Sequence, residues 1–128
     1  GSVAGYIRSN SDGSTLIFQA RDAAGHLQLF AVAVLGGTPR QLTQFAGGVA
    51  SDAAVHPSED WAAVAAEGRI YHVGFGASEA ATSPLHDEAL PGPAGNLSFS
   101  PDGSRLACNI EVDGVQRIGI LESPSHRE

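Results

Sequence analysis

A turn followed by an extended segment occurs three times in this chain at almost constant spacing. The three copies span residues 10–18, 56–64 and 100–108. Aligned on Ser11, Pro57 and Pro101, they recur after 46 and then 44 residues. Repeats of this length are typical of proteins built from successive small units that bury their apolar faces against one another. The spacing therefore limits the chain to a repeated architecture of about three units.

Each unit contains the same series of predicted strands. Apolar and polar residues alternate in each unit, and many of the apolar ones are Val, Ile or aromatic, which predicts strands. The first strands are expected at 6–9, 53–55 and 97–99, and the second at 15–20, 61–66 and 105–111. The third strands are expected at 27–35, 70–75 and 116–121. Asp12-Gly13 and Asp102-Gly103 are tight-turn pairs, because Asp bonds to its own backbone and Gly accepts a positive φ. Such short connections indicate antiparallel neighbours.

A fourth strand is clearest in the first unit, at residues 40–43, where we expect Leu42 to be buried. The second unit has a weak candidate at 84–90, and none is visible in the third. The fold class is therefore predicted to be all-β, with four-stranded antiparallel meanders that form the blades of a β-propeller. We expect a single partial propeller domain over residues 1–128, with blades at about 3–46, 47–91 and 92–128.

Two segments carry a resemblance to a known family. Residues 36–43 (GGTPRQLT) follow an apolar strand, and residues 100–107 read SPDGSRLA. Together they resemble the WD40-like repeats of TolB-type propellers, and they are similar to the propellers of prolyl oligopeptidase-type peptidases and oligogalacturonate lyases. The second unit departs from this pattern, with Pro57-Ser58-Glu59-Asp60 in place of Pro-Asp-Gly. The resemblance implies an exported, periplasmic bacterial protein that binds partner proteins, while a cytoplasmic location stays open.

The charge distribution argues against nucleic acid and membrane insertion. The chain has fourteen acidic and seven basic residues and a net charge of −7 at pH 7. All seven basic residues are arginines scattered singly along the sequence, so no basic stripe can follow a phosphate backbone. No apolar run approaches the ~18 residues that a membrane-spanning helix requires.

Sequence motifs of catalysis are absent. The chain lacks the Gly-x-Ser-x-Gly, His-Glu-x-x-His, Walker and dinucleotide-binding patterns. The single Cys108 lies in a strand pattern typical of a small buried residue. We therefore expect no catalytic residues, cofactor or metal, and a protein- or ligand-binding module rather than an enzyme. The alternative is a fragment of a propeller enzyme, either one related to oligogalacturonate lyases with His56 at a channel metal or the accessory propeller of a peptidase.

One side of the predicted inner strands is mostly polar. Inner strands line the central channel of a propeller, where such folds usually bind ligands. The candidate ligand-binding residues are Tyr6, Arg8, Asn10, Asp52, His56, Asn96 and Ser98. The alternative is that these side chains only hydrate a water-filled channel.

Three blades are too few to close a ring. Each flank would then expose an apolar sheet face, and another chain is the simplest cover for such a surface. Two copies of three blades make six, the number in the TolB-type propeller. We therefore expect a homodimer in which two chains complete a six-bladed ring around a common twofold axis.

Overall fold

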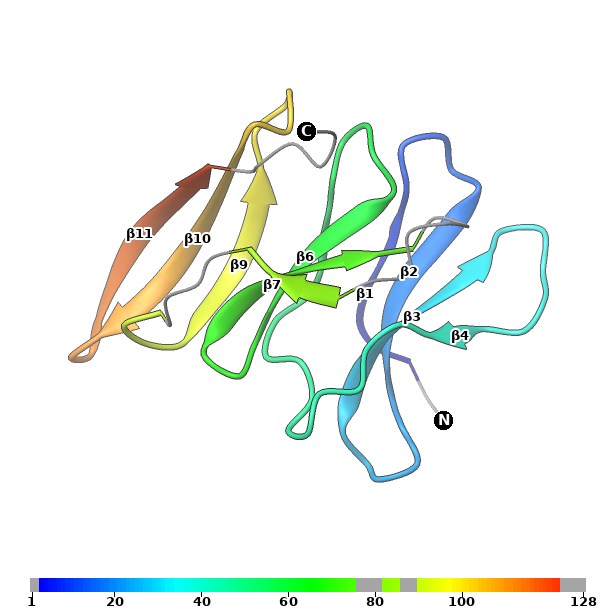
Figure 1. Cartoon of the computed structure of the whole chain (residues 1–128), viewed down its shortest axis with the longest axis horizontal. Helices are drawn as coiled ribbons and strands as arrows, with labels where there is room; N and C mark the ends of the chain where they lie inside the picture. The colour runs from blue at the N-terminus through cyan, green and yellow to red at the C-terminus, as the bar shows by residue number, and fades with distance from the viewer. Residues whose placement is uncertain (1–2, 76–81, 86–89, 123–128) are drawn as a thin grey trace.

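The computed structural model describes residues 3–75, 82–85 and 90–122, and in this part of the chain all the regular secondary structure is β-strand. Eleven strands form three antiparallel sheets that lie side by side in chain order, with the first sheet at the right of Figure 1 and the third at the left. The predicted all-β fold of successive meanders is confirmed. The three sheets fall within the predicted blades, whose boundaries stay predictions.

The first sheet contains β1 (Val3–Ser9), β2 (Thr15–Arg21), β3 (Leu27–Ala33) and β4 (Arg40–Gln41), hydrogen-bonded in that order. The second contains β5 (Ala54–Val55), β6 (Trp61–Ala66), β7 (Arg69–Gly74) and β8 (Thr82–Pro84), again in order. The third contains β9 (Ala94–Phe99), β10 (Arg105–Val112) and β11 (Val115–Glu122), with β10 in the centre.

The outer strands depart most from the prediction. β4 has two residues where four were expected, although Leu42 is buried as predicted and its N–H donates to Leu29 O at 2.7 Å. β8 ends at Pro84, where the candidate strand at 84–90 was expected to begin. The backbone N–H of Leu85 still donates to Ile70 O in β7, and that of Leu90 donates to Gly68 O in the turn before β7. This edge of the sheet is therefore paired irregularly. Residues 86–89 lie outside the described part.

The turn between the first and second strands has one geometry in all three units. The residue before it donates its backbone N–H to the carbonyl five residues later: Asn10 to Thr15 at 3.0 Å, His56 to Trp61 at 2.9 Å, and Ser100 to Arg105 at 2.9 Å. The recurrence of this bond shows that the sequence repeat is a structural repeat.

Two of these turns contain the predicted Asp-Gly pair. The carboxylates of Asp12 and Asp102 each accept the backbone N–H two residues later at 3.0 Å. That bond, together with hydroxyl donors from Ser104 and Ser100, lowers the pKa of Asp102 to about 2. Gly13 and Gly103 have φ of +76° and +77°, which Gly adopts without the clash that a Cβ would bring.

The core lies between the sheets. Alternate residues of a strand point to opposite faces, so one set from each sheet meets the sheet before it and the other meets the sheet after it. We call the contact between the first and second sheets the first junction, and that between the second and third sheets the second junction. The first junction buries apolar residues of both its sheets, including Ile17, Leu29, Val64 and Val73. The second is centred on Trp61, whose ring lies 5.1 Å from His56, 5.2 Å from Phe99 and 4.4 Å from His72, centroid to centroid. All six residues of β6 are buried, because the second sheet is packed between the first sheet and the third.

A buried glutamine fastens the segment that leads from the first sheet to the second. Gln28 is fully buried, and its Nε2 donates to Phe45 O at 2.7 Å and to Asp22 Oδ2 at 3.1 Å. Its Oε1 accepts the Thr43 hydroxyl at 2.7 Å and the Phe45 N–H at 3.1 Å. Every polar atom of this amide is therefore bonded, which is what makes its burial tolerable.

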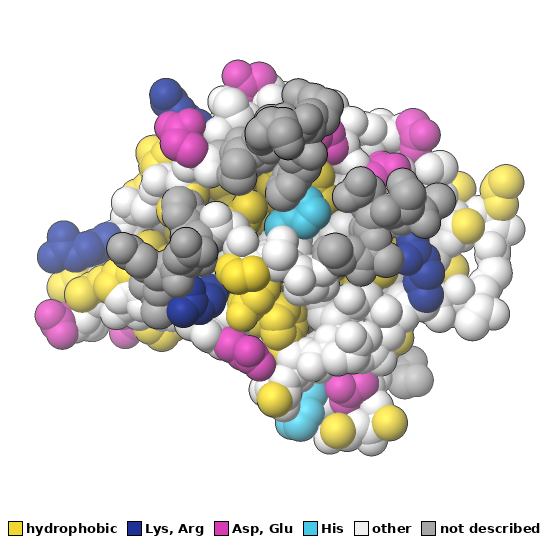
Figure 2. Space-filling model, in the orientation of Figure 1, with side chains coloured by type: hydrophobic (Ala, Val, Ile, Leu, Met, Phe, Trp, Pro, Cys, Tyr) yellow, Lys and Arg dark blue, Asp and Glu magenta, His cyan; other side chains and the backbone are white. Residues whose placement is uncertain are grey.

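The surface over β11 is unusually apolar for an exposed strand. Val115, Ile118 and Ile120 are 52%, 70% and 63% exposed. Figure 2 shows hydrophobic side chains near the left edge of the molecule, over the β10–β11 hairpin, with basic and acidic side chains beside them and others scattered over this face. The scattering agrees with the absence of a basic stripe in the sequence.

Alanine at position 103 should reveal how tightly the third sheet fits against the second. A Cβ there would lie 2.3 Å from Nε2 of the buried His56, whereas a Cβ on Gly13, in the equivalent turn of the first sheet, would have no atom within 4 Å. Gly13→Ala should lower the free energy of unfolding by about 1 kcal/mol, the cost of a left-handed alanine. Gly103→Ala should cost roughly 1–3 kcal/mol more, because the neighbouring ring must move.

Urea unfolding of the two variants measures this difference directly. Their φ angles match within 1°, so backbone strain cancels between them. Equal losses would show that the turn at residue 103 does not press against His56.

Candidate functional site

A cavity of about 420 Å³ opens where the three sheets converge. It is lined by Arg8 of β1, by residues 50–53 that precede β5, and by residues 95–97 of β9. All three sheets thus contribute to one hollow, and each does so with its inner strand or with the segment leading into that strand.

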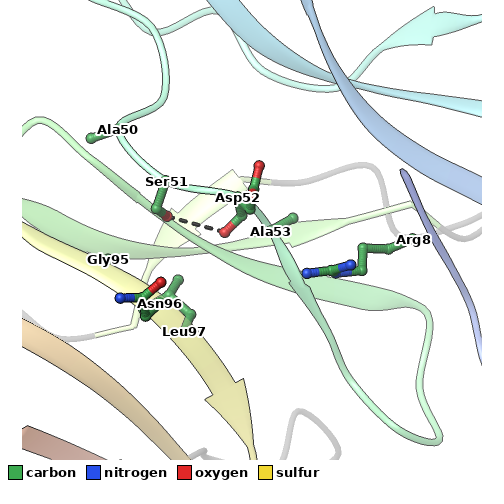
Figure 3. A pocket seen from close by; sticks show the side chains of 8 residues that line it. All are labelled: Arg8, Ala50, Ser51, Asp52, Ala53, Gly95, Asn96 and Leu97. Atoms are coloured by element: carbon green, nitrogen blue, oxygen red, sulfur yellow. Dashed lines mark hydrogen bonds between the residues drawn. The ribbon is translucent and has the colours of Figure 1, made fainter. Parts of the chain in front are cut away.

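Besides Ser51, three polar side chains line the cavity. In Figure 3, Arg8 extends into the hollow from one side, Asn96 faces it from β9 on the other, and Asp52 lies between them. The guanidinium can donate a pair of hydrogen bonds to a carboxylate, the Asp52 carboxylate can accept from a cation or an N–H, and the amide can do both. The cavity therefore offers complementary partners to a charged or peptide-like ligand.

Ser51, which lines the cavity, is held by hydrogen bonds within the second sheet and by one bond to the first sheet. Ser51 Oγ donates to Asp52 O at 3.1 Å and accepts the Ala65 N–H at 3.0 Å. Ser51 O accepts Gln19 Nε2, from the first sheet, at 2.6 Å. Asn96 has a φ of +54°, a left-handed conformation that Asn tolerates better than most residues. The segment that carries Asp52 is thus bonded both to β2 and to β6.

The structure brings together three of the seven predicted residues: Arg8, Asp52 and Asn96. Ser98 is exposed on β9 but does not line the cavity, and Tyr6 lies in β1 with its side chain outside the described part. Asn10 and His56 lie at the ends of the inner strands, where each is buried and is used in the following turn.

The turn-capping role of these two residues is well defined. Asn10 Oδ1 accepts the Thr15 N–H at 3.0 Å, and Asn10 Nδ2 donates to Asp60 of the second sheet at 3.3 Å. His56 Nδ1 accepts the N–H groups of Ser58 and Glu59, both at 3.1 Å, so the ring proton belongs on Nε2. His56 thus stabilises a turn and the second junction.

Sequence reasoning did not name three other residues that line the cavity, Ser51, Gly95 and Leu97. The Gly-Asn pair at 95–96 was the one available signal, because such residues inside a strand mark irregular backbone.

The surroundings of the Cys108 thiol make it unreactive. Cys108 is 2% exposed, and burial raises the pKa of its thiol, so the thiolate that would act as a nucleophile is disfavoured. Among the described residues, no three His, Cys, Asp or Glu side chains are grouped closely enough to hold a metal ion. No helix in the described part is long and apolar enough to cross a membrane.

Comparison with known proteins identifies the fold. No protein-family profile matches the chain. With 94% of its length aligned, the chain superposes on a TolB-like protein of Agrobacterium tumefaciens with a TM-score of 0.77 at 18% identity, covering 43% of that protein. It has the TolB-type β-propeller fold. A TolB from Acinetobacter baumannii gives a TM-score of 0.74 at 17% identity, with 94% of this chain and 30% of that one covered.

A curated relative also matches this TolB-like chain in sequence. It is the uncharacterized protein YidR of Escherichia coli (strain K12), 36% identical over 104 residues. The match covers 80% of this chain and 24% of YidR, so the chain spans about a quarter of the length of that relative.

Proposed function

We propose that this TolB-like chain is a non-catalytic binding module that holds an extended segment of a partner protein or peptide in the cavity between its inner strands. The observation that supports the proposal is the convergence of Arg8, Asp52 and Asn96 from three sheets on one open hollow. A site assembled from three rigid sheets presents its polar groups in fixed geometry, which lowers the entropy lost on binding.

The chemistry of the lining favours a peptide that carries an acidic group. Arg8 matches a carboxylate, because its planar fork can form two parallel hydrogen bonds. Asp52 and the Asn96 amide can bond to backbone N–H and C=O groups on either side of that carboxylate. Leu97, Ala50 and Ala53 supply the small apolar surfaces on which a peptide chain can lie.

A set of blocked hexapeptides that differ only in one central residue, Asp, Lys, Ser or Leu, would test this function. Titrated into the ¹⁵N-labelled chain, the Asp peptide should shift the backbone amide signals of Asp52, Gly95 and Asn96. Arg8→Ala should weaken its binding by about tenfold or more, the loss expected for one charge-assisted contact of about 1.4 kcal/mol.

Arg105→Ala is the matched control. Arg105 lies outside the cavity, with its Nε 3.5 Å from Glu122 on the exposed surface, so its loss should leave peptide affinity unchanged. If no peptide shifts the cavity signals, or if Arg8→Ala binds as well as the parent chain, the proposed site is wrong.

The lyase-like form of the propeller-enzyme alternative gains no support from His56, the residue on which it depended. His56 would have to present a ring nitrogen to a channel metal. Its Nδ1 instead accepts two backbone N–H groups, and its ring is buried against Trp61, Phe99 and the turn at Gly103.

A periplasmic location goes with this proposal. Its support is the TolB-like fold, together with the export that the sequence resemblance implies. Osmotic shock of the source cells, followed by antibody detection of the native protein, should release it with the periplasmic fraction. Recovery with the cytosol would overturn the location and leave the binding proposal standing.

A further inference from the structure

The inner strands of all three sheets are irregular at the same place of the repeat. The inner strand advances four residues over 4–8 and over 50–54, and three residues over 95–98, while the neighbouring strand advances two each time. Each of these segments is therefore a β-bulge, a feature that turns side chains toward a site. Together the three segments contain every residue that lines the cavity.

The bulges place opposite charges on two walls of this cavity. The Arg8 guanidinium enters it from the first sheet, and the half-buried Asp52 carboxylate belongs to the second. Figure 3 shows no hydrogen bond between these two side chains, so the charges share one hollow without bonding to each other. A ligand with a carboxylate and an ammonium group a short distance apart would form a charge-assisted bond with each of them.

A second hollow, of about 240 Å³, adjoins the first at Asp52. Residues 50–52 line both hollows, and the second is completed by Gln19, Leu27 and Val49. Leu27 and Val49 give the second hollow an aliphatic wall, whereas the first is lined by Arg8 and the Asn96 amide. A group that binds to Asp52 can therefore extend into an apolar hollow and into a polar one.

We infer that the site binds the free amino end of a peptide. The terminal ammonium group lies on Asp52, the first side chain fills the second hollow, and the carboxylate of an acidic second residue binds Arg8. This inference rests on the proposed function and names the part of the peptide that the cavity takes.

The order of the two residues follows from the geometry of an extended chain. Successive side chains point to opposite sides, so a first residue directed into the second hollow sends the next side chain back toward Arg8. The aliphatic wall of Leu27 and Val49 favours Val or Leu as the first residue. An ammonium group suits Asp52 because it has three N–H donors and no acceptor.

Two hexapeptide amides of the sequence Val-Asp-Ser-Gly-Ser-Gly, one with a free and one with an acetylated amino end, test the inference. Titrated into the ¹⁵N-labelled chain, the free peptide should bind about tenfold or more tightly than the acetylated one, which lacks one charge-assisted contact. Asp52→Asn keeps the shape of the side chain and removes its charge, so it should abolish this preference.

Asp113→Asn is the matched control. Asp113 is exposed in the turn between β10 and β11, outside the cavity, so its substitution should leave the preference for the free peptide intact. The ¹⁵N spectrum of each variant establishes that the fold is kept. An acetylated peptide with Lys in place of Val distinguishes a terminal ammonium group from that of a side chain, and it should bind as weakly as the acetylated Val peptide.

Equal affinities of the free and acetylated Val peptides would overturn the inference and leave the proposed function standing, because both peptides carry the carboxylate for Arg8. A preference that survives Asp52→Asn would also overturn it, as would tight binding of the acetylated Lys peptide. If neither Val peptide shifts the cavity signals, the proposed function itself is wrong and the inference falls with it.

Discussion

Both faces of each sheet carry apolar side chains, and both therefore have to be covered. Neighbouring residues in a strand point to opposite sides, so a sheet with only one buried face would show a strict apolar–polar alternation. β6 is the extreme case, since all its residues are buried between two neighbours. Stacking side by side is the arrangement that meets this demand for successive meanders, and it places the inner strands next to one another. The cavity is a consequence of that placement.

Polar contacts fix the angle and register of the stacked sheets. Apolar contact is non-directional, so it brings sheets together without choosing how they sit. The bonds from Gln19 to Ser51 O, from Asn10 to Asp60 and from Arg40 Nη2 to Phe75 O join the first sheet to the second at separate places. At the second junction the contact of the Gly103 turn with His56 has the same effect. Asp52 in particular depends on these contacts, because it precedes β5, a strand of only two residues.

Much of the fold could be predicted from the sequence, for a local reason. β2, β6 and β10 begin at the predicted residues 15, 61 and 105, because a tight turn with its own hydrogen bonds precedes each of them. The outer strands were predicted less well, since β4 and β8 pair at a sheet edge where few contacts define their ends. The burial of Gln28 has no local signal, because its partners lie up to 17 residues away in a loop.

The candidate site was predictable in part. Strand parity placed Arg8, Asp52 and Asn96 on one side of the predicted inner strands, and all three line the cavity. Their role in binding a ligand stays a prediction. Strand parity could not show that the side chains of Asn10 and His56 bond to the backbone of the following turns, since those bonds depend on the backbone geometry after the strand ends. Nor could it show that Ser51 lines the cavity, because Ser51 is held by bonds to two different sheets.

The most direct test of whether burial between neighbouring sheets stabilises this chain is to replace the residue at one equivalent position of each sheet by alanine. Leu29→Ala and Ile70→Ala should each lower the free energy of unfolding by roughly 2–5 kcal/mol, as expected for a buried aliphatic side chain. Ile118→Ala, at the same position with 70% of its surface exposed, should change it by less than about 0.5 kcal/mol. Urea unfolding measures each of these losses. Similar losses at all three positions, or negligible losses at Leu29 and Ile70, would contradict this account of the fold.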